Sequence, residues 1–302
     1  MEENHHRLIY KVKSEYSGDT IKDILRKEYS MSSRFFKSIK NNGYILLNNK
    51  ESKWYKTAWE GDIIIVEMGE EKIDAAPNPI PINIIYEDYD ILLINKKPAT
   101  VVHPTRGHIY DTLANAIAYH WEKLGISCKI RFANRLDMDT SGLILIGKNK
   151  FAHQNIQEQM ILNKVKKIYW AFVEGIIEEK EATINAPIGR AQEGDIKRKV
   201  IDGARDSITH YKVIQEYNNA SIVEIQLETG RTHQIRVHMD YIGHPLLGDS
   251  LYNKSSKLID RQALHARVLG FKLPRSGKYM EFKAGLPEDM LNLQKRLGQG
   301  SL

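Results

Sequence analysis

The chain has 302 residues, a net charge of +6 and an apolar fraction of 42%, so a core can form and a polyanionic partner such as nucleic acid is a candidate. Cys128 is the only cysteine, which excludes an intrachain disulfide, and neither a signal-peptide core nor an apolar run of the roughly 20 residues of a membrane span is present. We expect a soluble, cytoplasmic monomer with no membrane partner.

The charge is unevenly distributed along the chain. Between Thr20 and Lys56 there are nine Lys and Arg against three acids, whereas six acids face one Lys between Glu60 and Asp74. The acidic stretch runs into GEEKIDAAPNPIP, whose Pro residues are typical of a connection between domains. The sequence therefore predicts a small basic domain at residues 14–70, a linker at 71–80 and a large domain at 81–290.

The small domain is predicted to hold two amphipathic helices and two strands. Asp19 or Thr20 can cap the first helix, Ser32 or Ser33 can cap the second, and Gly43 can end the second. YILLNN and DIIIVEM predict the strands. The second helix also carries the basic residues Arg34, Lys37 and Lys40. These residues could simply face solvent, but the compact basic unit favours an RNA-binding surface that contacts phosphates.

The large domain alternates strands with a few helices. INIIYED and DILLINK predict a hairpin, and a helix between Leu113 and Leu124 follows, capped by Asp111 or Thr112. GLILIG predicts a buried strand, residues 152–163 a helix, YWAFVEG and SIVEIQLE two further strands, and RTHQIRVHMDYIGH a last helix. This pattern predicts an α+β fold built on a large mixed, mainly antiparallel sheet. No glycine-rich phosphate loop is present, so we expect no cofactor.

The stretch NRLDMDTSG places Asp137 between an arginine and a predicted buried strand. The carboxylate could form a structural ion pair or could be held ionised for chemistry. Asp137 and Asp139 could instead form the carboxylate pair of a glycosidase, but on an extended segment they would point to opposite faces. His233 and His238 are five residues apart without an acidic cluster beside them, so we expect no metal site.

The remaining candidates for a site are three arginines and a tyrosine: Arg135, Arg231, Arg236 and Tyr169. Arginines beside one carboxylate keep it ionised and oriented. An ionised, oriented aspartate without a metal or a second acid is suited to covalent catalysis.

Four segments in order resemble the RluA-type pseudouridine synthases, bacterial enzymes that isomerise uridine in ribosomal RNA and sometimes in transfer RNA. They are NKKPATVVHPT, NRLDMDTSGLILIGKN, KKIYWAFVEG and ETGRTHQIRVHMDYIGHPLLGD, and the resemblance runs from about residue 82 to about residue 287. The earlier stretch SMSSRFFKSIKNNGYILLNN, followed by EGDIIIVEM, is similar to a small RNA-binding domain known from a ribosomal protein of the small subunit.

The resemblance implies a role for each matching residue. Asp137 of the RLD motif would be the catalytic aspartate, Tyr169 of the K-x-Y motif would pack against the base and act as general base, and Arg236 of HQIR would pair with Asp137. Arg135 would hold the flipped-out nucleotide, and Arg231 and His233 would contact the RNA.

Two positions depart from the family pattern, because Asn134 stands where His is usual and Thr100 where Gly is usual. The implied activity is cofactor-free isomerisation of uridine in structured RNA, with 23S ribosomal RNA as the expected target. Transfer RNA as the target and a non-catalytic RNA-binding role in ribosome assembly are the alternatives. A pure binder would have no need of Asp137, Tyr169 and Arg236 together.

Overall fold

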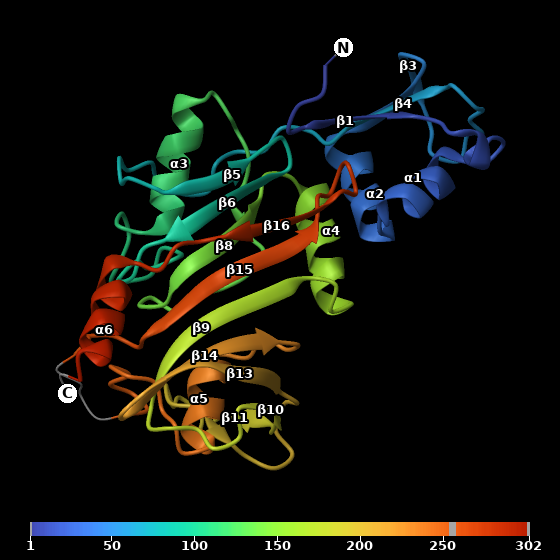
Figure 1. Cartoon of the computed structure of the whole chain (residues 1–302). Coiled ribbons are helices and arrows are strands. Elements are labelled where there is room, and N and C mark those ends of the chain that lie inside the picture. Colours follow the sequence, from blue (N-terminus) through green and yellow to red (C-terminus); the bar gives the residue numbers. More distant parts are fainter. Residues whose placement is uncertain (1, 254–257, 301–302) are drawn as a thin grey trace.

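The computed structural model describes residues 2–253 and 258–300 and places two sheets side by side along an elongated molecule (Figure 1). The first sheet belongs to the N-terminal part, which we call the small module, residues 7–68. Its elements in chain order are β1 (Arg7–Lys11), the short helix η1 (Ser14–Tyr16), α1 (Ile21–Tyr29), α2 (Ser33–Asn42), β2 (Tyr44–Leu47), β3 (Lys50–Ser52) and β4 (Ile63–Glu67).

The small module is an antiparallel sheet of order β1-β4-β2-β3 covered by α1 and α2. Thr20 and Ser32 cap the two helices through their side chains, and Gly43 ends α2, as the sequence predicts. β1 was not predicted, and it lies before residue 14, where the sequence analysis places the start of this domain. RLIYK is short but alternates, and it buries Leu8 and Tyr10 under the helices while its backbone pairs with β4.

The second sheet has ten strands and forms the large part of the molecule. Its main order is β10-β13-β14-β9-β15-β8-β6-β5, with β16 paired to β15 and β7 paired to β8. The strands are β5 (Ile84–Glu87), β6 (Ile91–Lys96), β7 (Arg131–Phe132), β8 (Ser141–Gly147), β9 (Lys166–Glu174), β10 (Glu181–Asn185), β13 (Ile208–Tyr217), β14 (Ala220–Leu227), β15 (Leu264–Lys272) and β16 (Tyr279–Lys283). A separate small ribbon is formed by β11 (Ile188–Gly189) and β12 (Lys199–Val200).

The pairing in this sheet is antiparallel except between β8 and β15, which run parallel at its centre. Gly142 makes that approach feasible: it has a φ of +113°, and a Cβ there would lie 2.3 Å from the carbonyl oxygen of Ala266. The predicted α+β class with a mixed, mainly antiparallel sheet is therefore confirmed.

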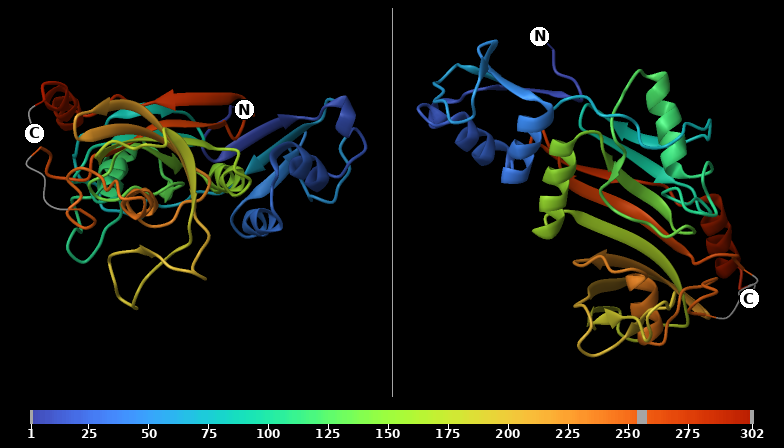
Figure 2. Two further views of the ribbon diagram at one scale, coloured as in Figure 1. Left: turned by 60° about the horizontal axis from the view of Figure 1, so that its bottom comes forward. Right: turned by 180° about the vertical axis from the view of Figure 1, so that it is seen from behind.

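Four helices cover the two faces of the large sheet (Figure 2). β8 is buried along its whole length because alternate residues pack under different helices. Ile144 and Ile146 lie in the cluster beneath α3, whereas Leu143 and Leu145 lie in the cluster beneath α4. The helices are α3 (Leu113–Lys123), α4 (Lys150–Ile161), α5 (Gln234–Tyr241) and α6 (Glu288–Gly298).

The helices α3 and α5 share one face of the sheet, where Tyr169 of β9 contacts both of their hydrophobic clusters. Thr112 caps α3, as predicted, and Trp121 of this helix is fully buried. His120 is only partly buried and lies with its Nε2 2.7 Å from Glu87. This face carries the candidate site described below.

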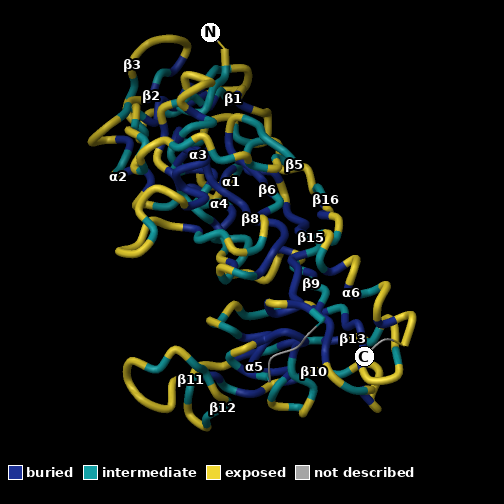
Figure 3. The backbone as a smooth tube through the Cα atoms, turned by 90° about the vertical axis from the view of Figure 1, so that its left-hand side faces the viewer, coloured by how far each residue is buried: buried dark blue, intermediate teal, exposed yellow. Residues whose placement is uncertain are grey.

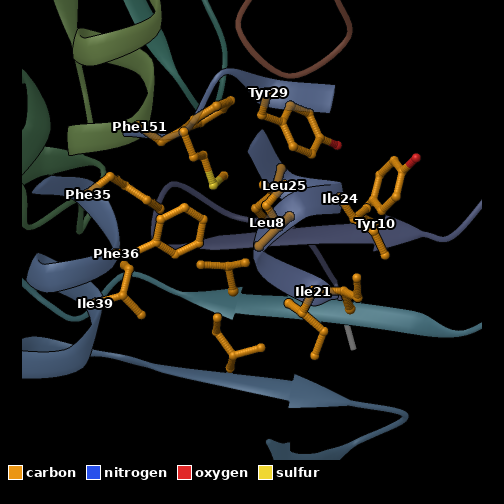
Figure 4. Packing of buried hydrophobic residues seen from close by; sticks show 14 of the residues in the cluster. Leu8, Tyr10, Ile21, Ile24, Leu25, Tyr29, Phe35, Phe36, Ile39 and Phe151 are labelled. Atoms are coloured by element: carbon orange, nitrogen blue, oxygen red, sulfur yellow. The ribbon is translucent and has the colours of Figure 1, made fainter. Parts of the chain in front are cut away.

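The small module packs against the large part of the molecule through α4 (Figure 4). Phe151, in the first turn of α4, is 2% exposed and belongs to the hydrophobic core of the small module. Its ring centroid lies 5.4 Å from that of Tyr29 and 6.4 Å from that of Phe35. The Ser32 hydroxyl also donates to Gln154 of α4 at 2.7 Å. The two parts therefore share a core as well as a chain connection.

The predicted linker, residues 71–80, runs along the surface of the large part and is bound to it. Glu71 accepts two hydrogen bonds of 2.6 Å from Arg131, and Asp74 accepts one of 3.0 Å from the amide of Ile130. Ile73 and Ala75 pack against the cluster beneath α3. The composition of residues 71–80 is typical of an interdomain linker, but these contacts hold the segment in a defined position on the large part. None of the helices in the described residues is both long and apolar enough to cross a bilayer.

Candidate active site

Asp137 lies in the loop between β7 and β8, where a tight turn fixes it. The amide of Thr140 donates to the carbonyl oxygen of Asp137 at 3.1 Å, and β8 starts at the next residue. Asn134 attaches the start of the loop to β8, because its side-chain amide donates to Leu143 O at 3.1 Å and accepts from the amide of Leu145 at 2.8 Å. The side chain of Asn134 therefore forms two hydrogen bonds with the backbone of β8, as a neighbouring strand would.

Arg236 of α5 connects Asp137 to a second carboxylate. Its Nη1 donates to Asp137 Oδ2 at 3.1 Å, while its Nε and Nη2 form a bidentate pair of 2.7 Å bonds with Asp249. Asp249 is fully buried, whereas the side chain of Asp137 is 31% exposed. The pKa of Arg236 is raised, because the hydrogen bonds and charges of both aspartates outweigh its burial. One guanidinium thus anchors to the interior and presents a fixed donor to the exposed carboxylate.

Asp249 was not singled out from the sequence. It is the last residue of the segment ETGRTHQIRVHMDYIGHPLLGD. The only feature of the sequence that could have indicated a role for it is that it is a single acid after a short apolar stretch. Gly248 before it has a φ of +73°, and a Cβ there would lie 2.2 Å from the carbonyl oxygen of Arg261, so only glycine fits. This close packing turns Asp249 inward to meet Arg236.

His233 precedes α5 and lies with its Nε2 3.8 Å from Asp137 Oδ2. Its backbone is left-handed with a φ of +58°, and its Nδ1 lies 3.0 Å from the hydroxyl of Tyr252. Burial is the main cause that lowers the pKa of His233, and the neighbouring charge of Arg236 adds to it. His233 is therefore neutral at neutral pH and acts as a polar neighbour of Asp137 rather than as a second cation.

Tyr252 was also not predicted as part of the site. Its ring packs edge-on against His233 and lies 5.0 Å from the guanidinium of Arg236. Its hydroxyl accepts a hydrogen bond of 2.8 Å from the amide of Arg198, which connects the β11–β12 ribbon to the site. The loop that joins the two strands of this ribbon, residues 190–198, is largely exposed (Figure 3).

A cavity of roughly 290 Å³ opens beside Asp137. Its walls combine apolar side chains with the charged groups above, and Tyr169 forms part of them. Burial and the charge of Asp137 raise the pKa of Tyr169 to about 12, so its phenol is neutral at neutral pH. The residues that line the cavity include Arg135, Leu136, Asp137, Lys167, Tyr169, Arg231, His233, Ile235, Arg236 and Leu264.

The six residues predicted for the reaction centre or its nucleotide therefore line one cavity, although they come from segments about a hundred positions apart. Arg135 is exposed at the rim. Arg231 is half-buried and donates from its Nε to the carbonyl oxygen of Asp206 at 3.0 Å.

Arg34, Lys37 and Lys40 lie elsewhere, on the exposed face of α2. Within residues 2–253 and 258–300, none of the three has an ion-pair or hydrogen-bond partner through its side chain. They do not join the cavity and stand as a separate predicted contact surface.

Lys96 is a buried cation behind the Asp137 turn that sequence reasoning did not find. Its ammonium group donates to the carbonyl oxygens of Met138 at 2.7 Å, Lys97 at 3.0 Å and Thr100 at 3.1 Å. Burial lowers its pKa to about 8, so Lys96 remains mainly charged at neutral pH. The lysine ties the turn of Asp137 to the loop after β6.

That loop contains the family departure at Thr100. Thr100 donates its amide to Met138 O at 3.2 Å, and the left-handed residue of the loop is Ala99, with a φ of +53°. The position that would suit glycine is therefore Ala99 and not Thr100.

No cluster of three or more His, Cys, Asp or Glu suited to a metal ion occurs in the part of the chain that the structure describes. His238, considered above as a ligand, has both ring nitrogens occupied: Nδ1 lies 2.8 Å from the Thr209 hydroxyl and Nε2 lies 2.9 Å from the carbonyl oxygen of Ala186.

Comparison with known proteins decides the family. A family model described as RNA pseudouridylate synthase matches residues 90–241. YlyB of Bacillus subtilis, named as an uncharacterized RNA pseudouridine synthase, is 41% identical over 261 residues, which cover 85% of this chain and 86% of YlyB. The chain belongs to the RNA pseudouridine synthase family. The protein is therefore an isomerase that acts on RNA, and the resemblance found in its sequence is confirmed.

Two further comparisons agree with membership of this family. A protein of Pseudomonas aeruginosa named ribosomal large subunit pseudouridine synthase D is 40% identical over 234 residues, 73% of each chain. The solved structure of human RNA pseudouridylate synthase domain containing 1 covers 69% of this chain and 84% of its own, with a TM-score of 0.56 and 28% identity. The likeness of the small module to a ribosomal-protein RNA-binding domain stays a prediction.

Proposed function

We propose that this pseudouridine synthase modifies uridine in the RNA of the large ribosomal subunit and that Asp137 is its catalytic carboxylate. The observation that carries the proposal is the position of Asp137, fixed by Arg236 at the mouth of a cavity of roughly 290 Å³. The name of the Pseudomonas aeruginosa relative supports ribosomal RNA as the target.

The reaction breaks the bond between N1 of uracil and C1′ of ribose, turns the base, and joins C5 to C1′. The net change moves one proton from C5 to N1, so no atom is gained or lost. Asp137 assists the cleavage as a carboxylate, either by bonding to the sugar or the base or by stabilising the sugar cation. The apolar wall of Leu136, Ile235 and Leu264 keeps the detached base in place while it turns.

Tyr169 takes part in this scheme as a neutral phenol. Its ring forms a wall of the cavity against which the base packs, and its hydroxyl is the candidate acceptor of the C5 proton. Because its pKa is raised to about 12, the neutral phenol can accept the C5 proton only while it gives up its hydroxyl proton, and the net destination of that proton is N1 of the uracil.

The target uridine must first leave its stack, which costs a few kcal/mol. Arg135 and Arg231 line the cavity, and we expect them to contact the phosphates or the extruded nucleotide. Arg34, Lys37 and Lys40 of the small module would bind RNA further away and supply affinity and placement. Their lack of partners among the described residues supports this role.

The experiment is the exchange Asp137→Asn, with Asp139→Asn as a matched control in the same turn. We expect Asp137→Asn to abolish tritium release from RNA labelled at C5 of uridine, because the near-isosteric change removes charge and nucleophilicity. Asp139→Asn should retain most of the activity, and both variants should bind RNA like the wild type. Substantial turnover by Asp137→Asn would refute the assignment.

The RNA target is tested by mapping pseudouridines in ribosomal and transfer RNA from cells with and without the gene. Loss of pseudouridine from large-subunit RNA alone is the expected result. Loss from transfer RNA would replace the proposed target. An unchanged map, with binding to ribosomal precursors intact, would favour the non-catalytic role in ribosome assembly.

A further inference from the structure

Arg261 is a buried arginine just before β15, and it contacts the backbone of the turn that carries Asp137. Its side chain is 8% exposed. Its Nη1 donates to three backbone carbonyl oxygens, those of Asp139 at 2.9 Å, Gln262 at 3.1 Å and Leu264 at 3.3 Å. The first of these belongs to the Asp137 turn, the second to the residue after Arg261, and the third to the first residue of the central strand β15.

The other donors of Arg261 anchor it to α6. Nε and Nη2 form a bidentate pair with Asp289 in the first turn of that helix, at 2.6 Å and 3.0 Å. Asp289 Oδ1 also accepts from the amide of Met290 at 2.8 Å, so the carboxylate is itself oriented by the helix. The guanidinium is therefore fixed between two elements that are far apart in the sequence.

This arrangement constrains where Asp137 can be. A guanidinium is planar, and its donors point in fixed directions, so a hydrogen bond from Nη1 fixes the position of the acceptor more closely than a flexible ammonium would. Asp139 O is two residues from Asp137, and the bond from the Thr140 amide to Asp137 O closes the turn between them. If Arg261 is removed, the carbonyl of Asp139 loses its buried donor and the turn can shift.

We propose that Arg261 is a positioning residue for Asp137 and that Asp289 of α6 is its anchor. The proposal rests on the proposed role of Asp137 and adds a residue that touches neither the nucleotide nor the carboxylate. Arg261 acts on geometry: it keeps the Asp137 turn in register with the centre of the sheet, where the cavity opens.

Arg275 offers a matched control because it has the same kind of environment away from the cavity. It lies between β15 and β16, its side chain is 14% exposed, and it forms a bidentate pair with buried Asp90. It also donates to backbone carbonyl oxygens, those of Arg7 at 3.0 Å and Asn4 at 3.1 Å. Loss of either arginine removes a bidentate carboxylate pair and donors to backbone carbonyl oxygens, but only Arg261 of the two reaches the Asp137 turn.

The experiment compares Arg261→Met with Arg275→Met in the full-length protein. We expect both to lower the melting temperature, but only Arg261→Met to lower kcat, by about 10- to 100-fold, since a misplacement of about 1 Å can cost about 100-fold. The Kd for RNA should stay at the wild-type value in both. Arg261→Lys should recover part of kcat, and Asp289→Asn, which leaves the Asp139 contact in place, should lose less than Arg261→Met.

Hydrogen exchange of the peptide that covers residues 134–143 gives a readout that is independent of turnover. The amide of Thr140 should exchange faster in Arg261→Met and at the wild-type rate in Arg275→Met. If Arg261→Met does not fold, Arg261→Lys and Asp289→Asn provide the same comparison against Arg275→Lys. Equal kcat and equal exchange in the Arg261 and Arg275 variants would overturn the proposal. Absence of turnover in the wild type would instead refute the proposed function, and the exchange rates would still decide the role of Arg261.

Discussion

The three cations on the exposed face of α2 and the two buried arginines that contact the Asp137 turn have opposite surroundings. Arg34, Lys37 and Lys40 are exposed on α2, and no side chain in the described ranges pairs with them. Arg236 and Arg261 are buried, with bidentate carboxylates and further acceptors on nearly every side.

This difference in exposure and pairing determines what each group of cations can do. An unpaired exposed cation keeps its full capacity for phosphates, and its contribution depends on salt. A buried cation must be compensated by the protein, and once compensated it holds its partners in fixed positions. The exposed cations of α2 are thus suited to binding RNA phosphates, and the buried arginines are suited to holding Asp137 in a fixed position. Four experiments test this contrast.

Arg236→Ala should have the largest effect. It leaves the fully buried Asp249 without its cation, which we expect to cost about 3–5 kcal/mol of unfolding free energy. Asp137 loses its donor as well, so tritium release should fall with stability. Thermal melts and turnover measure the two effects, and Lys180→Ala, in an exposed surface pair, is the control. A wild-type melting temperature with normal turnover would show that Arg236 does not hold the site.

Phe151→Ala should weaken the packing of the small module against the large part of the molecule. The side chain is 2% exposed within the core of the small module, so its removal should cost about 3–5 kcal/mol. Because Phe151 is not among the residues that line the cavity, kcat per folded molecule should change little. Limited proteolysis between residues 68 and 82 should become faster, and Phe151→Leu should behave nearly as the wild type. Unchanged proteolysis and stability would show that the two regions are joined elsewhere.

Replacing Arg34, Lys37 and Lys40 together with Gln should leave melting unchanged and weaken RNA binding. If all three contact phosphates, the slope of log affinity against log salt should become shallower by roughly 2–3, since each contact contributes somewhat under ~1. A ribosomal RNA fragment titrated across a salt series measures the slope. Replacement of Lys278, Lys283 and Lys295 with Gln is a charge-matched control. Identical slopes for the two triple variants would argue against the α2 surface as the RNA contact.

Ala99→Gly should have the smallest effect and should be stabilising. Ala99 has a φ of +53°, where a Cβ is unfavourable, so glycine should gain about 0.5–1 kcal/mol after its greater freedom in the unfolded chain is subtracted. The same exchange at Ala118, in the middle of α3, should cost roughly 1 kcal/mol. Chemical denaturation measures both. A destabilised Ala99→Gly would show that the loop does not strain this residue.

Much of the local structure could be predicted because local interactions determine it. The caps Thr20, Ser32 and Thr112 were visible from residue type and spacing, and GLILIG was visible as a buried strand. β1 was missed because five residues carry too little periodicity, and a strand at that position depends on β4, more than fifty residues later.

The motifs of the sequence contain Asp137, Tyr169 and Arg236, so the family and the candidate residues of the site could be identified without a structure. How these side chains are held became visible only in the folded molecule. Asp249, Tyr252, Lys96 and Arg261 support them through contacts between elements that are distant in the chain, and such contacts leave no spacing or periodicity in the sequence. The burial that compels these charges to pair exists only after the sheet and its helices have packed.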